Sequence, residues 1–398
     1  MIPYGKQWIS QQDIDAVVSV LTSDFLTQGP AVPRFEKAFA KKVSADFAVS
    51  VNSATSALHI ACMALGVKKG DMVWTSPVSF VASSNCALYC NAIVDFVDID
   101  PTTYNMSVKA LEKKLHEAKI NGTLPKVVIP VHLAGQSCDM KAIHSLSLKY
   151  GFKIIEDASH ATGAKYDGHP VGSCKYSDIA VFSFHPVKII TSGEGGMAVT
   201  NSQEIMLSMA SLRSHGVTRD PKLMTIEPDG AWFYQQLELG FNYRMTDIQA
   251  ALGLSQLARL DMFVEQRHSI ANTYFDKLES DDIVLPFQHL DSYSSFHLFI
   301  LNFTDLAGPH SRDEVFNRMR QSGINVNLHY IPIYRHPYYS AMGFDPSCYP
   351  EAEAYYQRAI SIPMFPNMTP EEQDFVIDVI RSDTVKTFKS PSGYQDLF

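Results

Sequence analysis

The sequence predicts an α/β fold, with a large domain built on a mostly parallel sheet covered by helices and a smaller α+β domain after it. Two observations predict this architecture. Between about residues 45 and 200, short β-rich apolar runs alternate with amphipathic stretches, as in strands joined by helical crossovers. After residue 201 the alternation stops, and a polar, irregular stretch over 217–240 precedes a different arrangement of strands and helices.

The first region forms the predicted large domain, which covers residues 1–245. Its predicted strands are Phe47–Val51, Met72–Thr75, Ile93–Val97, Val127–Val131, Lys153–Ile155, Ile179–Phe184 and Met197–Thr200. Its predicted helices include Ala57–Leu65, Val108–Ala118 and Met140–Tyr150. A sheet of this kind binds ligands at the carboxyl ends of its strands.

The second region forms the predicted small domain, which covers residues 246–383. Its first helix is expected over Thr246–Leu260, with Thr246 or Asp247 as the N-cap. Strand-like and helical segments then alternate, and they are His297–Phe303, 311–321, Ile324–Leu328, 351–360 and 370–381. Residues 384–398 have the composition of a polar tail.

The composition predicts a globular, cytoplasmic protein. Of 398 residues, 46% are apolar and 19% charged, and the net charge of −9 argues against binding to nucleic acid or to an anionic membrane. The six cysteines show neither a CxxC pair nor a zinc-ribbon spacing, so reduced thiols and no metal site are expected. The N-terminal residues lack a signal-peptide pattern, and no apolar run approaches the roughly 18 residues of a membrane span.

Small hydroxyl-bearing residues follow the first predicted strand in the segment Asn52–Ala57 and open a helix. The N–H groups and hydroxyls at such a helix start can bind an anion. The alternative is a plain N-cap formed by Ser53 or Thr55. Because the chain has no GxGxxG or GxxxxGK[ST] motif here, neither a dinucleotide fingerprint nor a P-loop is supported.

Two adjacent acids, Glu156 and Asp157, end the strand that begins at Lys153. Side chains alternate along a strand, so only one of these carboxylates is expected to face a ligand crevice. That carboxylate could hold a protonated ring nitrogen, a metal or a ribose hydroxyl, or it could cap the following turn. His160 follows three residues later and is expected near the same crevice.

A lysine, Lys188, lies just past the strand that ends at Phe184 and before three glycines, Gly193, Gly195 and Gly196. Glycines let the backbone approach a ligand or another strand closely. A lysine desolvated at such a turn has a lowered pKa and becomes a nucleophile for carbonyl carbon, whereas an exposed loop lysine is the alternative. An anion cradle, a strand-end acid and a nucleophilic lysine together match the requirements of pyridoxal phosphate.

The sequence resembles the nucleotide-sugar aminotransferases of the DegT/DnrJ/EryC1 family. The resemblance runs from Leu26–Pro30 to about Pro366 and implies a fold type I pyridoxal-phosphate-dependent transferase. The segments that carry it are Asn52–Ala57, Glu156–His160, Ser183–Lys188, Thr191–Gly196 and Phe241–Met245.

The resemblance also implies a role for each matching residue. Lys188 would form the Schiff base with pyridoxal phosphate, and Asp157 would pair with the pyridine nitrogen. The other implied cofactor contacts are the phosphate ligands Thr55, Ser56 and Ser183, the stacking ring of Phe80, His160 near the phenolic oxygen, and Asn242 from a neighbouring subunit. A homodimer with shared active sites follows from that last contact.

The implied reaction transfers the amino group of L-glutamate to C4 of a UDP-linked 4-keto-6-deoxy-2-acetamido sugar, as in the pseudaminic acid branch of the family. The products would be a 4-amino sugar nucleotide and 2-oxoglutarate. Other 4-keto or 3-keto sugars linked to dTDP or GDP, a sugar dehydratase and a regulatory homologue are the alternatives. Lys188 favours transamination, because the dehydratase branch has histidine at that position. The sequence assigns no firm role to Arg213, His215, Arg244, His329 or the 217–240 stretch.

Overall fold

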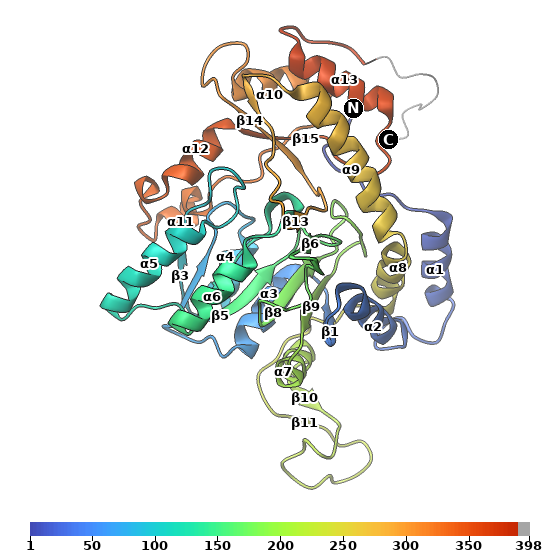
Figure 1. The fold of residues 1–398 in the computed structure, drawn as a ribbon. Helices are drawn as coiled ribbons and strands as arrows, with labels where there is room; N and C mark the ends of the chain where they lie inside the picture. Colours follow the sequence, from blue (N-terminus) through green and yellow to red (C-terminus); the bar gives the residue numbers. More distant parts are fainter. Residues whose placement is uncertain (389–398) are drawn as a thin grey trace.

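The protein, described here by a computed structural model over residues 1–388, is built around a seven-stranded sheet (Figure 1). In sheet order its strands are β1 (Phe47–Val51), β9 (Gly196–Thr200), β8 (Ile179–Ser183), β5 (Lys153–Asp157), β4 (Val127–Ile129), β2 (Met72–Thr75) and β3 (Ile93–Phe96). Strand β9 is antiparallel to both of its neighbours, and the remaining pairs are parallel. The predicted mostly parallel sheet is confirmed.

Helices cover both faces of this sheet, as predicted. One layer consists of α3 (Ala54–Ala64), α4 (Ala82–Tyr89) and α7 (Gln203–Arg213). The other consists of α2 (Ala31–Val43), α5 (Val108–Asn121), α6 (Met140–Tyr150) and α8 (Asp247–Leu257). In β8, Ile179 and Val181 pack in the first layer, whereas Ala180 and Phe182 pack in the second. Every residue of β8 is buried, because neither face meets water.

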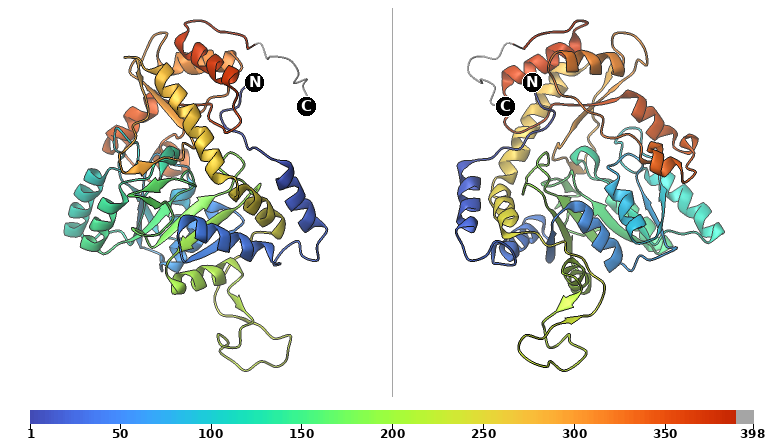
Figure 2. Two further views of the ribbon diagram at one scale, coloured as in Figure 1. Left: turned by 45° about the vertical axis from the view of Figure 1, so that its right-hand side comes forward. Right: turned by 180° about the vertical axis from the view of Figure 1, so that it is seen from behind.

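A second hydrophobic core lies above the large sheet in the view of Figure 1. Its antiparallel sheet has the order β12 (Ile283–Val284), β14 (Phe299–Phe303) and β15 (Ala359–Ile362). Helices α9 (Leu260–Leu278), α10 (Arg312–Gln321) and α13 (Pro370–Arg381) contribute to this core. Figure 2 shows α9 running from this region down to α8 beside the large sheet. The boundary at residue 245 stays a prediction.

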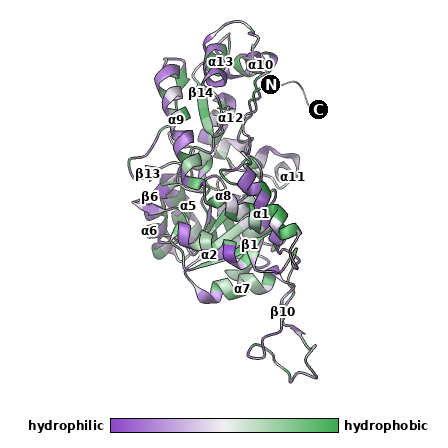
Figure 3. Ribbon diagram, turned by 90° about the vertical axis from the view of Figure 1, so that its right-hand side faces the viewer, coloured by the Kyte–Doolittle hydropathy of each residue, from purple (hydrophilic) through white to green (hydrophobic). Residues whose placement is uncertain are grey.

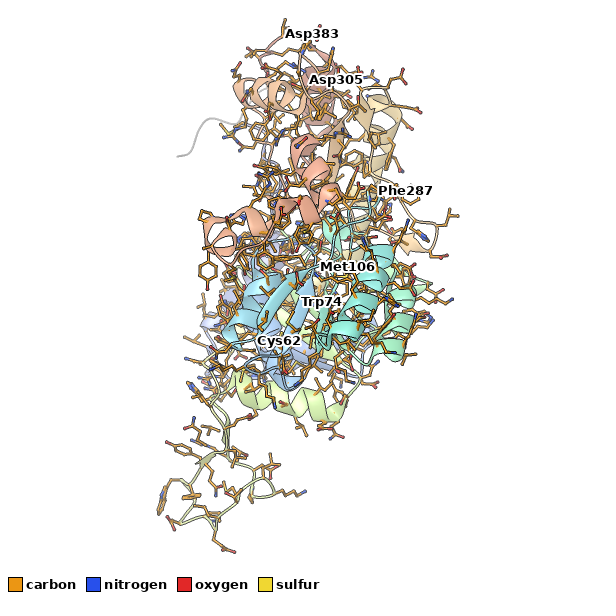
Figure 4. All side chains as sticks on the ribbon, turned by 90° about the vertical axis from the view of Figure 1, so that its left-hand side faces the viewer. Cys62, Trp74, Met106, Phe287, Asp305 and Asp383 are labelled. Carbon is orange, nitrogen blue, oxygen red and sulfur yellow. The ribbon has the colours of Figure 1, made fainter. Side chains whose placement is uncertain are left out.

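The remaining elements are short or peripheral. They are α1 (Gln11–Leu21), the three-stranded sheet β13 (Ser292–Tyr293), β6 (Lys165–Tyr166) and β7 (His169–Pro170), the helices α11 (Pro337–Ser340) and α12 (Pro350–Arg358), and 3₁₀ turns at Leu133–Gly135, Ile333–Arg335 and Pro346–Cys348. Figure 4 labels Trp74 and Met106, which belong to the hydrophobic core between the large sheet and helices α5 and α6. It also labels Cys62, which lies in the core on the opposite face of the sheet.

Three sequence expectations change. The predicted strand Ile324–Leu328 is wrong: Ile324 and Asn327 form only isolated bridges, with Ile2 and Ser361, because each partner meets the segment at a single residue. The predicted helix 351–360 ends at Arg358, where the chain becomes β15. The 217–240 stretch is not irregular throughout: β10 (Val217–Thr218) pairs with β11 (Gln235–Gln236) at the base of an arm that projects from the body (Figure 3).

Within residues 1–388, the structure contains no helix long and apolar enough to cross a membrane. Of the predicted polar tail, residues 389–398 lie outside the described residues.

Candidate active site

The carboxyl ends of β1, β5 and β8 lie at one edge of the large sheet. Val51 and Ser183 both pair with Gly196 of β9, so the segments that follow β1 and β8 start side by side. A cavity of about 1180 Å³ opens at this edge. It is lined by residues 52–56, by the segments after β5 and β8, by the start of α4, and by residues 327–331. The three segments that the sequence singled out therefore face one space.

The start of α3 lines this cavity and has hydrogen-bond donors that no described residue accepts from. Ser53 is the N-cap, and its Oγ accepts a hydrogen bond from the Ser56 N–H at 3.1 Å. Ser56 Oγ donates to Asn52 Oδ1 at 2.7 Å. Within residues 1–388, the backbone N–H groups of Ala54 and Thr55 and the Thr55 hydroxyl have no hydrogen-bond partner. The segment is thus a capped helix start whose remaining donors face the cavity, as anion binding at this position would require.

Gly196 lets β9 pass directly beneath the cradle. A Cβ atom at this position would lie 2.6 Å from the Ala54 nitrogen and 2.6 Å from the Ser53 carbonyl oxygen, both backbone atoms that cannot move aside independently. The absence of a side chain at Gly196 therefore sets the position of the α3 N-terminus relative to the sheet. This requirement explains one of the three glycines after Lys188.

We expect Gly196→Ala to displace the cradle and to weaken cofactor binding by about 1–3 kcal/mol, roughly 5- to 150-fold in Kd. Titration of the apo-protein with pyridoxal phosphate, followed by absorbance, measures this loss. Gly122→Ala is the matched control. It strains a residue with φ +68° but meets no atom within 4 Å, so it should lower the melting temperature without weakening cofactor binding.

Asp157 ends β5 with its carboxylate facing the cavity. Its Oδ2 accepts a hydrogen bond from Ser83 Oγ at 2.6 Å, and its Oδ1 accepts one from the Ser159 N–H at 3.2 Å. Because Ser83 gives its proton to the carboxylate, it must accept the 2.7 Å hydrogen bond that joins it to Ser79. These hydrogen bonds fix the orientation of the Asp157 carboxylate at the wall of the cavity.

The neighbouring acid, Glu156, points to the opposite face of β5. There it contacts His132 Nε2 at 2.7 Å and accepts a hydrogen bond from Ser177. The prediction that only one of the two strand-end acids faces the crevice is confirmed, and the one that does is Asp157.

Lys188 is partly buried, and it lines the cavity. Burial lowers the pKa of its amine to about 8, and the carboxylate of Asp157 opposes part of this shift. Within residues 1–388, Nζ has no hydrogen bond or ion pair. An amine with a pKa this close to neutrality is a competent nucleophile for an aldehyde carbon.

The other predicted cofactor contacts occupy different parts of the cavity. Ser183 lies at the end of β8, and Phe80 keeps 60% of its surface exposed at the rim. His160 contacts the hydroxyl of Tyr330, which the sequence left without a role. Burial, followed by the charge of Lys188, lowers the pKa of His329 to about 3, so this imidazole is neutral in the cavity wall.

Asn242 lies outside the cavity of its own chain. Its side chain is exposed, and its backbone forms an isolated bridge with Ser214. Arg213 is structural, because its guanidinium pairs with Glu36 at 2.5 Å and donates to the Ser50 carbonyl at 2.8 Å. Contact of Asn242 with the cofactor of a neighbouring subunit stays a prediction.

Local sequence patterns did not reveal Ser83 or Tyr330. Ser83 lies in the first turn of α4, 74 residues before the carboxylate it contacts, and Tyr330 lies 170 residues after His160. Both residues lie within the span of the family resemblance, from Leu26 to about Pro366, but in none of the five segments that carry it.

The sheet topology, the cradle at a helix start and the lysine and carboxylate in one cavity define a fold type I pyridoxal-phosphate-dependent transferase. Residues 7–381 match the model of the DegT/DnrJ/EryC1/StrS aminotransferase family, and the chain belongs to that family.

Relatives of known name or structure match nearly the whole chain. The UDP-4-amino-4,6-dideoxy-N-acetyl-beta-L-altrosamine transaminase of Campylobacter jejuni is 36% identical, over 99% of this chain and 100% of that protein. The Streptococcus pneumoniae protein Spr1654, in its PMP form, has a TM-score of 0.87 and 29% identity, over 96% of this chain and 99% of that one. Helicobacter pylori PseC, an aminotransferase involved in the biosynthesis of pseudoaminic acid, has a TM-score of 0.86 and 29% identity, over 95% and 98%.

Proposed function

We propose that this aminotransferase moves the amino group of L-glutamate to C4 of a UDP-linked 4-keto-6-deoxy-2-acetamido sugar, giving 2-oxoglutarate and a 4-amino sugar nucleotide of the pseudaminic acid type. The observation that carries the proposal is the shared cavity, in which the Lys188 amine, the Asp157 carboxylate and the donors of the α3 start face the same space. The names of the Campylobacter and Helicobacter relatives support the sugar substrate.

The residues present fit pyridoxal phosphate. When bound, this cofactor supplies an aldehyde that takes up an amino group and a ring that accepts electrons. The N–H groups of Ala54 and Thr55, with the hydroxyls of Thr55 and Ser183, would hold its phosphate. Asp157 would keep a proton on the ring nitrogen, and Phe80 would cover one face of the ring.

Lys188 has two tasks in this proposal. Its neutral amine would hold the cofactor through the aldehyde carbon, and once the amine of glutamate had displaced it, the freed Lys188 amine would take up the proton that leaves the substrate carbon. Because the same cavity serves both substrates in turn, 2-oxoglutarate leaves before the keto sugar binds, and ping-pong kinetics follow.

Cofactor uptake should follow the lowered pKa of Lys188. We expect the rate at which apo-protein combines with pyridoxal phosphate to rise through pH about 8, since the neutral amine is the reactive form and its pKa lies below the usual 10.5. Stopped-flow absorbance from pH 6 to about 11 measures this dependence, with Nα-acetyl-lysine, whose only amine is the ε-amine, as the control. A midpoint near that of Nα-acetyl-lysine would contradict the burial of the amine.

The substrate is tested with a panel of UDP- and dTDP-linked 4-keto sugars, each supplied with L-glutamate, and product configuration is read by NMR. Turnover of the 2-acetamido UDP sugar to a 4-amino product supports the proposal. Preference for a dTDP-linked sugar would replace the proposed substrate and leave the proposed reaction unchanged. Deoxygenated product formed without glutamate would indicate a dehydratase instead.

We also propose a cytoplasmic homodimer in which Asn242 completes the cavity of the partner subunit. Its exposure outside its own cavity supports this arrangement. Mixing inactive Lys188→Ala subunits with inactive Asn242→Ala subunits tests it, because a hybrid dimer would carry one cavity with both residues intact and would regain part of the activity.

A further inference from the structure

Tyr330 lies between two of the residues predicted to surround the cofactor. Its ring stacks on that of His160 with centroids 5.9 Å apart and an interplanar angle of 23°, and its centroid is 6.3 Å from that of Phe80. It reaches the cavity from the stretch 327–331, whereas His160 follows β5. The phenol of Tyr330 therefore spans the space between the histidine side and the rim of the site.

The hydrogen bonds of His160 fix the direction in which Tyr330 can donate. The Ala134 backbone N–H donates to His160 Nδ1 at 3.3 Å, so Nδ1 carries no proton. In the neutral imidazole the proton is then on Nε2, which donates to the Tyr330 hydroxyl oxygen at 3.0 Å. Burial, followed by the charges of Lys188 and His329, lowers the pKa of His160 and keeps this ring neutral.

Two consequences follow. His160 has no N–H left for a ligand, because its single proton is used by Tyr330. The Tyr330 hydroxyl proton has no acceptor within residues 1–388, since the only hydrogen bond of this hydroxyl is the one it receives from His160. A half-buried phenol thus faces a ligand cavity with its hydroxyl proton unpaired among the described residues.

We propose that Tyr330 donates its hydroxyl hydrogen bond to the phenolic oxygen of the bound cofactor, and that His160 is a positioning residue that acts through Tyr330. The proposal rests on the proposed cofactor-dependent function. It revises the contact that the family resemblance gives to His160, because the ring nitrogens of that residue are already paired.

The surroundings keep Tyr330 a donor. Burial, followed by the charges of Asp157 and Tyr4, raises its pKa well above the usual value, so the hydroxyl stays protonated. The titratable groups that line the cavity with Tyr330 are Tyr4, Asp157, His160, His185, Lys188, Glu194, His297, His329 and His336. Among them the imidazoles of His160, His297 and His329 have lowered pKa values and are neutral donors or acceptors.

A hydrogen bond to the deprotonated phenolic oxygen favours that form and lowers the pH midpoint of the cofactor's absorbance. We expect the holo-protein with Tyr330→Phe to show a midpoint higher by roughly one pH unit, a tenfold change in proton affinity. Tyr334→Phe is the matched control. It removes a buried phenol that donates to Glu353 at 2.9 Å, outside the cavity, and should leave the midpoint unchanged.

A second variant separates this role from a folding defect. His160→Asn removes the donor that orients Tyr330, so its midpoint should rise less than that of Tyr330→Phe, and in the Tyr330→Phe protein it should add nothing further. A Tyr330→Phe midpoint equal to wild type, or fully additive shifts in the double variant, would overturn the proposal. A wild-type protein that binds no pyridoxal phosphate would refute the proposed function, and this inference with it.

Discussion

Lys188→Ala is expected to abolish amino-group transfer from glutamate, with kcat falling about 10⁴-fold or more. Within residues 1–388, the side chains that line the cavity include no second lysine, so no other amine can attach the cofactor or carry the proton. The loss is measured as the absorbance change when holo-protein is mixed with glutamate alone. Borohydride reduction followed by peptide mass spectrometry should place the cofactor on Lys188 in wild type and nowhere in the variant.

The control for this experiment is Lys153→Ala. Lys153 is an exposed lysine that pairs with Asp178 at 2.9 Å on the far end of β5 from the cavity, so its removal should leave both readouts unchanged.

Loss of activity through misfolding can be recognised separately, from the stability of the apo-protein. Because burial lowers the pKa of Lys188, folding disfavours its charged form below pH 8, and this cost disappears as the pH rises above 10.5. The apo form of Lys188→Ala should therefore be at least as stable as apo wild type at pH 7.

The sequence predicted the parts of the site that lie within a few residues of a strand end. Lys188, Asp157 and the segment 52–56 follow β8, β5 and β1, and a parallel sheet brings the carboxyl ends of its strands to one edge. The alternation of side chains along β5 also predicted correctly that Glu156 and Asp157 point to opposite faces of the strand. These predictions depend only on local periodicity and on the topology that the periodicity implies.

Contacts between distant segments were beyond local patterns. Ser83 reaches Asp157 because α4 begins beside the end of β5, and Tyr330 reaches His160 because residues 327–331 line the cavity and pack against the core that contains α3 and α4. The same region contains the mistaken strand at Ile324–Leu328. Its buried apolar residues, Ile324 and Val326, produce a strand-like alternation, yet no neighbouring segment runs alongside for more than one residue. Pairing partners, and not the alternation alone, decide whether such a stretch becomes a strand.

Asp157→Asn should lower the rate of the glutamate half-reaction by about 10²- to 10⁴-fold while preserving the shape of the site. The amide cannot hold a proton on the ring nitrogen as an ion pair, and breaking a buried pair costs about 3–5 kcal/mol. Both carboxylate oxygens of Asp157 accept a hydrogen bond, one from the Ser83 hydroxyl and one from the Ser159 N–H. An amide has only one oxygen, so its NH₂ group would face one of these donors and that hydrogen bond would be lost. Stopped-flow absorbance with glutamate measures the rate, and titration with pyridoxal phosphate measures cofactor affinity.

Glu156→Gln is the matched control, since it makes the same chemical change one residue earlier on the same strand. Its side chain contacts His132 and Ser177 on the other face of β5, so the variant should lose thermal stability and keep the half-reaction rate. The pair of variants separates two explanations of a slow Asp157→Asn enzyme. If Glu156→Gln slowed the half-reaction equally, disturbance of β5 would account for both results. If Asp157→Asn reacted at the wild-type rate, the carboxylate would not support the ring nitrogen, and the assignment of this cavity to pyridoxal phosphate would fail.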